Sequence, residues 1–163
     1  ENSLPKGSAP FAVRYGLGQY KGLVSTQLVK GVLAPVCSPV LLSRHGPDLH
    51  TLLVSARRIQ TAGYNEWRDW SVQAGVDLER TSPAYGIEDF LVAIKALVTG
   101  QGLALLPKIL VSDQIASGEL VQFSPIPLEV EHTYHIAHTA ASARRPFVQD
   151  VVNWLQASAA HLN

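Results

Sequence analysis

The 163-residue sequence has only one cysteine, so no disulfide can form within the chain and a cytosolic origin is permitted. Cys37 follows an apolar run and has no histidine near it in the sequence. This setting predicts a buried, inert thiol rather than a nucleophile. We accordingly expect a cytoplasmic protein.

An excess of charge of either sign is also missing, because thirteen Lys and Arg residues balance thirteen Asp and Glu residues. A domain that mainly binds nucleic acid usually carries a basic excess. Arg57-Arg58 and Arg144-Arg145 are isolated pairs, which favour solvated faces over a binding patch. No DNA contact is therefore expected from these residues themselves.

Long apolar runs, a leader and methionine are absent as well. No apolar stretch reaches the ~18 residues that a membrane span requires. Residues 1–10 are polar and rich in turn-forming residues, unlike a signal peptide. The sequence therefore predicts no membrane partner, and the missing methionine indicates a processed or truncated piece of a longer protein.

Motifs of the common catalytic classes are missing too. The sequence has no G-x-S-x-G pentapeptide, no Walker phosphate loop and no H-E-x-x-H zinc helix. His132, His135 and His138 form the only cluster of metal-like residue types. On a strand His135 points away from the other two, which lie about 20 Å apart at roughly 3.3 Å per residue. We expect no metal, no cofactor and no catalysis.

What is present is a regular alternation of helix and strand patterns. In the clearest helix, residues 87–99, apolar residues recur at helical spacing, with Glu88 and Asp89 in the first turn. Gly100 follows where a left-handed C-cap belongs. The run T-G-Q-G-L-A-L-L-P at 99–107 is therefore helix, glycines and strand, which is the wrong order for a dinucleotide-binding fingerprint.

The remaining elements follow from similar local signals. Their alternation argues for an α/β fold with a largely parallel sheet. Strands are expected at 11–15, 24–29, 32–37, 57–61, 103–106, 119–123 and 131–138; helices begin near Pro39, Pro47, Asn65 and Pro107, and a last helix covers 144–162 with Phe147, Val151, Trp154 and Leu155 on one face.

Two tryptophans share one stripe of the helix that Asn65 is expected to cap. The spacing of Trp67 and Trp70 places both on the buried side of an amphipathic helix. The pattern favours core packing, with an aromatic box for a cofactor as the alternative.

Six stretches carry a joint signature: A-V-R-Y-G-L-G at 12–18, L-A-P-V-C-S-P at 33–39, W-R-D-W-S-V-Q-A-G at 67–75, A-L-V-T-G-Q-G-L-A-L-L-P at 96–107, S-G-E-L-V at 117–121 and V-V-N-W-L at 151–155. In this order and spacing they resemble the effector-binding domain of the LysR-type transcriptional regulators. The resemblance covers roughly residues 11–157. The branch of glycine-cleavage-regulator-like and β-lactamase-regulator-like members is the most similar.

The resemblance implies an α/β fold of the type 2 periplasmic-binding-protein kind, with lobe II largely complete and lobe I partial. On that mapping, residues 1–16 are a remnant of lobe I with the first crossing strand. Residues 17–130 form lobe II, and 131–163 hold the return strand and the C-terminal helix of lobe I. The family's helix-turn-helix, through which such regulators bind DNA, lies outside this sequence.

We therefore expect the ligand-sensing domain of a bacterial transcription regulator with a small-molecule effector. A solute-binding protein of the same fold that serves a transporter is the alternative, and an enzyme on this scaffold is the third reading. The family also pairs through its effector domains, so we expect a homo-oligomer, either a dimer or a tetramer. Apolar lobe I surface around Phe147, Val151 and Trp154 is expected to be bare and to promote pairing or aggregation.

The expected effector site follows from the fold, because ligands of open α/β sheets bind beyond the carboxyl ends of the strands. Tyr134 is added because it matches a tyrosine that related regulators place at the cleft. Each position also has a plain interpretation as a turn or packing residue. Acidic residues at the start of the 87–99 helix favour a neutral or polar effector over a strongly anionic one. The candidate effector-binding residues are Tyr15, Gly16, Leu17, Gln60, Thr61, Tyr85, Gly86, Ile87, Leu106, Pro107 and Tyr134.

Overall fold

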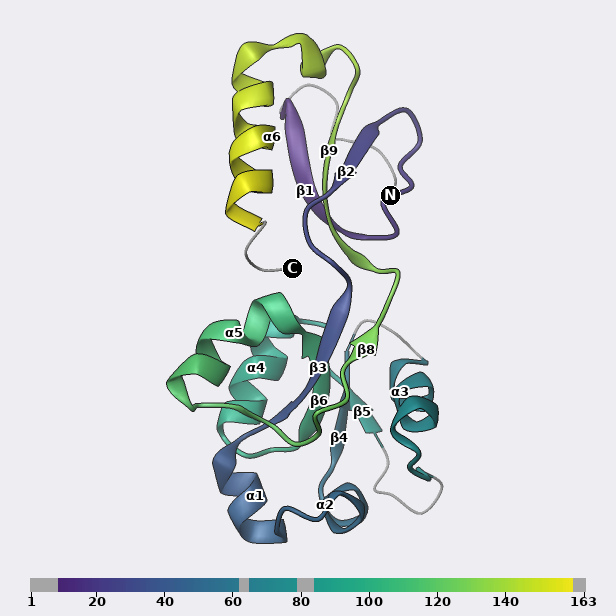
Figure 1. Ribbon diagram of the computed structural model, residues 1–163, viewed down its shortest axis with the longest axis vertical. Coiled ribbons are helices and arrows are strands. Elements are labelled where there is room, and N and C mark those ends of the chain that lie inside the picture. The colour runs from purple at the N-terminus through teal and green to yellow at the C-terminus, as the bar shows by residue number, and fades with distance from the viewer. Residues whose placement is uncertain (1–8, 62–64, 79–83, 160–163) are drawn as a thin grey trace. The chain divides into compact units, whose positions relative to one another are not determined.

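The computed structural model describes residues 9–61, 65–78 and 84–159, and it divides the chain into two compact units (Figure 1). Unit 1 comprises Glu1–Gly31 and Glu129–Asn163, and unit 2 comprises Val32–Leu128. The sequence-based mapping begins lobe II at residue 17, whereas unit 2 begins at residue 32. The difference arises because the strand at Val24–Gln27 pairs with the strand at Thr133–His138, which belongs to unit 1.

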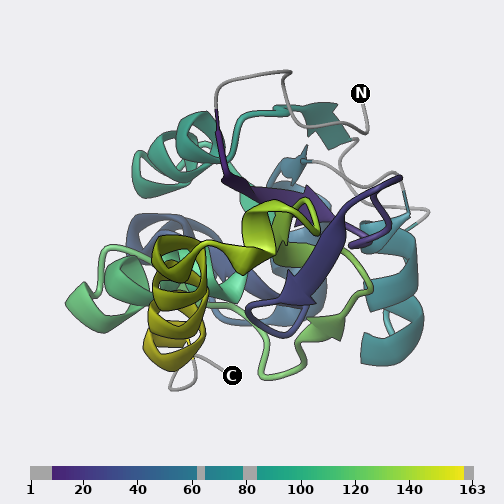
Figure 2. The same ribbon diagram turned by 90° about the horizontal axis from the view of Figure 1, so that it is seen from above.

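Unit 1 is a three-stranded antiparallel sheet with one long helix beside it (Figures 1 and 2). Strand β9 (Thr133–His138) lies between β1 (Phe11–Gly16) and β2 (Val24–Gln27), and both pairings are antiparallel. A short 3-10 turn, η1 (Ser142–Arg144), leads into α6 (Pro146–Ala159). The sheet therefore holds together strands that are distant in the sequence.

The predicted apolar face of α6 is divided between half-buried aliphatic residues, Val151 and Leu155, and exposed aromatic residues. Val148 and Ala159 are buried, whereas Phe147 and Trp154 are 62% and 65% exposed. Phe147 still contacts the sheet through the ring of Phe11, with ring centroids 6.4 Å apart. The aromatic residues of α6 thus lie at the surface of unit 1, as expected for the apolar lobe I surface.

Unit 2 is built on a mixed sheet, which corrects the expectation of a largely parallel one. Its strand order is β5-β4-β6-β3-β7. Strand β4 is parallel to β5 and β6, whereas β3 is antiparallel to β6 and β7. A fully buried apolar strand can pair with its neighbours in parallel or antiparallel orientation, so the sequence of β6 could not predict the direction of its pairing with β3. The strands are β3 (Val32–Cys37), β4 (Arg58–Gln60), β5 (Ala84–Gly86), β6 (Leu103–Pro107) and β7 (Val121–Gln122), and the short β8 (Leu128–Glu129) pairs with β3.

Local capping signals explain where the helices of unit 2 begin and end. Ser38 Oγ accepts a hydrogen bond from the Leu41 backbone N–H at 3.3 Å, and Pro39 occupies the first turn that follows. Gly100 has a φ of +77°, the left-handed conformation expected after a helix. The helices are α1 (Pro39–His45), α2 (Leu49–Ser55), α3 (Glu66–Ala74), α4 (Phe90–Val98) and α5 (Lys108–Ser117).

Helix α4 begins later than the expected residue 87. Asp89 is the residue before its first turn, and its carboxylate accepts hydrogen bonds from the N–H groups of Leu91 and Val92 at 2.8 and 3.1 Å. Glu88 and Asp89 therefore precede the helix instead of occupying its first turn. A carboxylate in this position satisfies N–H groups that the helix itself leaves unpaired.

An aromatic cluster joins α3 to the segment after β7. Trp67 and Trp70 are 4% and 0% exposed, which confirms the core packing expected of the stripe. The Trp67 ring lies nearly parallel to Phe123, with an interplanar angle of 9°, and Trp70 contacts both rings edge-on. The two indole N–H groups donate to the Ile59 and Ile126 carbonyls.

The predicted burial of Cys37 is confirmed, since its side chain is fully buried, and burial raises its pKa to about 12. His135 and His138 are also buried, while His132 is exposed. Among the residues that the structure describes, no group of three metal-ligating side chains is close enough to hold an ion. In the same ranges, none of the helices has the length and apolarity needed to cross a bilayer.

Candidate functional site

Unit 1 brings together four of the expected effector-binding residues. Tyr15 and Tyr134 are directly opposite each other on β1 and β9, with ring centroids 5.1 Å apart. Gly16 pairs with Thr133 at the end of the same ladder, and Leu17 follows with 47% of its surface exposed. Burial raises the pKa of Tyr134, so its phenol is neutral at ordinary pH. The pair therefore offers half-buried ring surface and the neutral phenol of Tyr134.

Unit 2 brings together the ends of three parallel strands. Gln60 at the end of β4 is paired with Gly86 at the end of β5, and the Ile87 N–H donates to the Gln60 carbonyl at 2.9 Å. Strand β6 is parallel to β4. The carboxyl ends of all three strands thus meet at one sheet edge, as the choice of candidates assumed.

Several candidates at this edge have little surface for a ligand. Leu106 and Pro107 are buried. Tyr85 and Ile87 pack against the hydrophobic core. The Tyr85 hydroxyl donates to the carbonyl of Gln101, which precedes the amino end of β6 and lies away from the candidate edge.

The residues that remain accessible there are few and form a small surface. Gln60 and Thr61 are half-buried and Gly86 is exposed. A Cβ at Gly86 would meet no atom within 4 Å, so the backbone is open to a molecule from solvent. We call Gln60, Thr61 and Gly86 the open edge.

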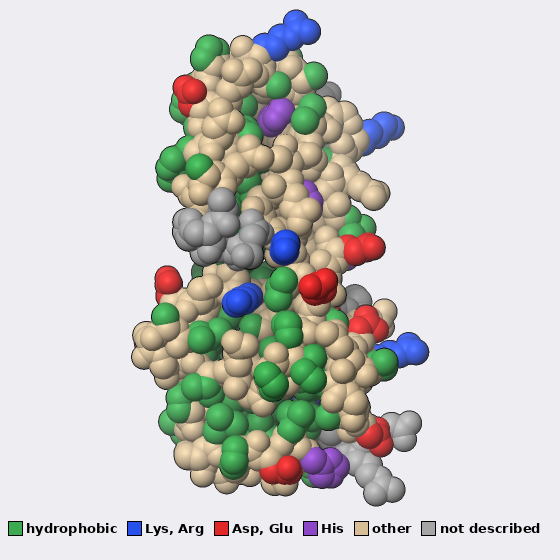
Figure 3. Space-filling model, viewed as in Figure 1, with side chains coloured by type: hydrophobic (Ala, Val, Ile, Leu, Met, Phe, Trp, Pro, Cys, Tyr) green, Lys and Arg blue, Asp and Glu red, His purple; other side chains and the backbone are tan. Residues whose placement is uncertain are grey.

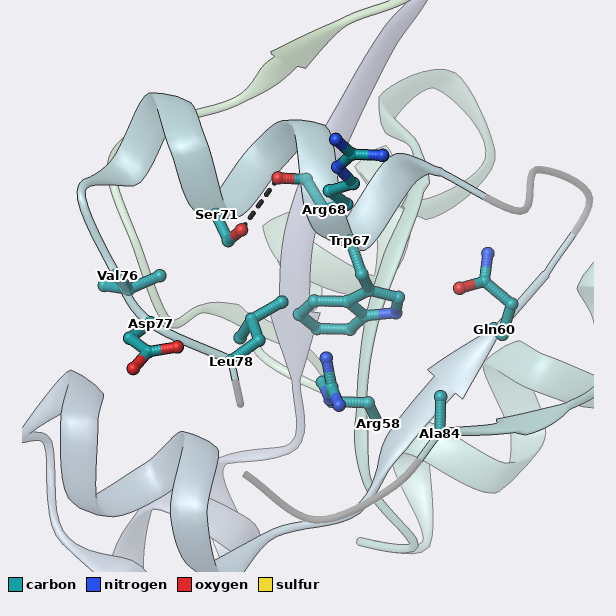
Figure 4. Close-up of a pocket in the computed structure, with 9 residues that line it drawn as sticks. All are labelled: Arg58, Gln60, Trp67, Arg68, Ser71, Val76, Asp77, Leu78 and Ala84. Atoms are coloured by element: carbon teal, nitrogen blue, oxygen red, sulfur yellow. Dashed lines mark hydrogen bonds between the residues drawn. The ribbon is translucent and has the colours of Figure 1, made fainter. Parts of the chain in front are cut away.

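A pocket of about 400 Å³ adjoins the open edge, and sequence reasoning missed it except for Gln60 (Figure 4). Its walls come from β4, α3, the segment after α3 and the start of β5. The signals that could have found it were Trp67, weighed as an aromatic box, and Arg58 in an arginine pair. Its polar and aromatic walls include Arg58, Gln60, Trp67, Arg68, Ser71 and Asp77.

Trp67 forms an aromatic wall of this pocket. The Arg58 guanidinium carbon lies 5.7 Å from the centre of its indole ring, and Figure 4 shows the two side chains facing each other. This distance is within the range of a cation–π contact. Arg58 is half-buried, and burial lowers its pKa.

Charge elsewhere is dispersed. On the face that Figure 3 shows, Lys and Arg side chains are scattered singly over both units instead of gathering in a basic patch. Arg57, next to Arg58 in the sequence, is exposed, whereas Arg58 turns into the pocket. The two arginines of this pair therefore have different surroundings, and only Arg57 matches the solvated face expected for both.

Comparison with known proteins agrees with this architecture. The family model described as LysR substrate binding domain matches residues 1–160. The HTH-type transcriptional activator AmpR of Rhodobacter capsulatus is 36% identical over 76% of the chain and 42% of that relative. The glycine cleavage system transcriptional activator of Escherichia coli K12 is 29% identical over 91% of the chain and 49% of the relative.

The fold is also similar to that of a solved effector domain. The AmpR effector binding domain from Citrobacter freundii superimposes with a TM-score of 0.83 at 19% identity, over 98% of this chain and 80% of that one. The chain spans about half the length of the curated relatives it matches. These relatives are transcriptional regulators, which does not favour the solute-binding alternative. The family match over nearly all residues shows that the chain belongs to the LysR substrate-binding domain family.

Proposed function

We propose that this chain is the effector-sensing part of a bacterial LysR-type transcription regulator, with DNA contacts made by a helix-turn-helix outside the present sequence. The names of its relatives support this, since AmpR is described as an HTH-type transcriptional activator. An effector that prefers one conformation of the protein would shift an existing equilibrium, and the DNA-binding part would respond to the shift. A protein with this role acts beside the chromosome, in the cytoplasm, and catalyses no reaction.

The observation that carries the proposal is the open edge of unit 2. Parallel strand ends expose backbone and short polar side chains, which a small molecule can approach closely. Gly86 adds a position without a side chain in the way. The Tyr15–Tyr134 pair of unit 1 is a second group of candidate contacts, supported by its half-buried rings.

We also propose that the effector at the open edge is neutral or polar. The Leu91 and Val92 N–H groups at the start of α4 are already bonded to the Asp89 carboxylate. Glu88 is exposed one residue earlier. An incoming carboxylate would find these donors occupied and would be repelled by two nearby negative charges.

A screen on the full-length protein tests the effector proposal. Amino acids, peptides, sugars and organic acids are compared by thermal shift, and a hit is then titrated calorimetrically. Gly86→Ala should fold normally, because its added methyl meets open space, and should weaken effector binding by blocking backbone approach. Thr61→Ala should weaken binding about 2- to 12-fold through loss of one hydrogen bond.

Thr51→Ala is the matched control, because Thr51 is an exposed threonine elsewhere in unit 2. Tight binding that survives Gly86→Ala and Thr61→Ala would show that the effector does not contact the open edge. The parent gene gives an independent test of the regulator itself. A helix-turn-helix encoded upstream supports the proposal, and a secretory signal in that place would refute it.

Finally, we propose that the chain self-associates as a dimer or tetramer through the exposed aromatic residues of α6. Phe147 and Trp154 are unusually accessible for side chains of their size. Sedimentation of the double variant Phe147→Ser, Trp154→Ser should show a shift toward monomer. Val72→Ser in unit 2, where Val72 is 78% exposed, is the control and should leave the distribution unchanged. A wild-type chain that stays monomeric at high concentration contradicts this proposal.

A further inference from the structure

The connection between β1 and β2 packs against one face of the unit 1 sheet (Figure 1). We call this connection, residues 17–23, the Tyr20 loop. Arg14 is directly opposite His135 in the ladder of β1 and β9, and Gly16 is two residues further along, so all three positions belong to the same face. We propose that the Tyr20 loop is a lid that opens and closes over His135 while the sheet beneath it stays folded.

The closed loop is held to the sheet by packing. The Arg14 guanidinium carbon lies 5.2 Å from the centre of the Tyr20 ring, within the range of a cation–π contact. The Tyr20 hydroxyl lies against Gly16, where an added Cβ would be 3.2 Å from its oxygen. Gly18 lies against the ring of His135, since a Cβ at Gly18 would be 2.5 Å from Nε2 and 2.6 Å from Cδ2.

No hydrogen bond ties the Tyr20 loop to the sheet in the part of the chain that the structure describes. The Leu23 N–H donates to the Tyr20 carbonyl at 3.1 Å, but this bond lies within the loop. Leu17 is 47% exposed, and Gln19 and Lys21 are exposed as well. A segment with few buried contacts and no hydrogen bonds to its surroundings opens at a lower free-energy cost than the sheet that carries it.

The hydroxyl of Tyr20 opposes closure of the loop. Its oxygen is buried, and none of the described residues forms a hydrogen bond with it. A buried hydroxyl without a partner has lost its hydrogen bonds to water, which costs free energy. Opening returns this hydroxyl to water. The closed loop is therefore stabilised by the Tyr20 ring and by Gly18, and destabilised by the Tyr20 hydroxyl.

Two candidate effector contacts of unit 1 are part of this arrangement. Gly16 lies under the Tyr20 hydroxyl, and Leu17 is the first residue of the loop. A ligand that bonds to the freed hydroxyl or to the uncovered Gly16 backbone would favour the open loop. This link to the effector rests on the proposed function. The lid itself does not, and its test uses no effector.

Carbethoxylation of histidines by diethyl pyrocarbonate, read by peptide mass spectrometry, measures opening of the loop. Nδ1 of His135 is 3.1 Å from the Thr133 carbonyl, and a carbonyl only accepts, so Nδ1 carries the hydrogen and Nε2 the reactive lone pair. Gly18 covers this Nε2, so His135 should react only through the open loop. Exposed His132 should react rapidly in every variant, and His138, buried on the opposite face of β9, reports whether the sheet stays folded.

Two glycines of the loop provide a matched pair of variants. Gly18 and Gly22 both have a φ of +75°, so alanine strains the backbone similarly at either position. Only Gly18→Ala places a Cβ against His135, because a Cβ at Gly22 would meet no atom within 4 Å. The rate of His135 modification should therefore be at least about fivefold higher in Gly18→Ala than in Gly22→Ala.

Tyr20→Phe should change the rate in the opposite direction. This variant keeps the ring and removes the hydroxyl that lacks a partner, so His135 should react at least about fivefold more slowly than in the wild type. Lys21→Gln, at an exposed position of the same loop, should leave the rate unchanged. If Gly18→Ala does not fold, the comparison of Tyr20→Phe with the wild type decides. An unchanged or faster rate in Tyr20→Phe, equal rates in the two glycine variants, or a parallel change at His138 would overturn the proposal.

Discussion

Replacement of Gly102 by alanine should destabilise unit 2, because β6 approaches β4 too closely at this point to admit a side chain. A Cβ at Gly102 would lie 2.5 Å from the Arg57 carbonyl oxygen and 3.3 Å from Ile59 Cγ1. An ordinary carbon–oxygen contact is about 3.3 Å. The start of β6 must therefore move by about 0.8 Å, the difference between these two separations.

A movement of this size also breaks a backbone hydrogen bond. The Leu103 N–H donates to the same Arg57 carbonyl at 2.8 Å, and lengthening by about 0.8 Å places the pair beyond hydrogen-bond distance. The lost bond and the strained packing together cost about 2 kcal/mol. For a chain of this length, that corresponds to a fall in the melting temperature of roughly 4–8 °C.

Urea denaturation followed by tryptophan fluorescence measures the effect, since Trp67 and Trp70 are buried in unit 2. Gly86→Ala is the control, because its added methyl meets no atom within 4 Å, and its stability should match the wild type within about 0.5 kcal/mol. If Gly102→Ala were as stable as the wild type, or if Gly86→Ala lost as much stability, then the close approach of Gly102 to the Arg57 carbonyl would not be what excludes a side chain there.

Three further outcomes follow from single contacts. Because burial raises the pKa of Cys37 to about 12, its thiol should resist a disulfide reagent at mildly alkaline pH in the native protein and react once unfolded. The Thr51 N–H bonded to the Asp48 carboxylate lowers the pKa of that carboxyl. The Asp48 cap should therefore stabilise α2 fully at a pH above the ordinary carboxyl pKa, and this stabilisation should be lost as the pH falls through the lowered pKa. A carboxyl NMR titration would show the lowered pKa of Asp48. Asp48→Asn should abolish this pH dependence. Trp70→Phe loses the bond to the Ile126 carbonyl and should cost about 1–3 kcal/mol in urea denaturation, whereas an unchanged midpoint would contradict a role for that bond.

Much of the local structure could be predicted because its causes lie within a few residues. Pro39 predicts a helix start, and the structure has one there. Gly100 adopts the left-handed conformation that a C-cap requires. The start of α4 was placed too early because Asp89 suits both a first turn and a cap, and only the cap geometry separates the two.

The candidate site was predicted less completely, because the sequence specifies strand ends but not which side chains remain accessible there. Gln60 and Gly86 do meet at one edge. Leu106 is buried, however, and the Tyr85 hydroxyl bonds to the Gln101 carbonyl away from that edge. Whether a side chain at a strand end is covered depends on the helices and strands packed around it, which are remote in the chain.

The sequence by itself determined most of the helices and strands, the burial of Cys37 and the tryptophan stripe, and the family, because these follow from local spacing and short motifs. The short strands β5 and β8 were not predicted. Only the tertiary structure decided that β3 is antiparallel to β6 and that β2 pairs with β9. It also decided that Arg58 lies over Trp67 while Arg57 is exposed. These features depend on contacts between distant segments, for which an apolar run or a pair of arginines has several compatible arrangements.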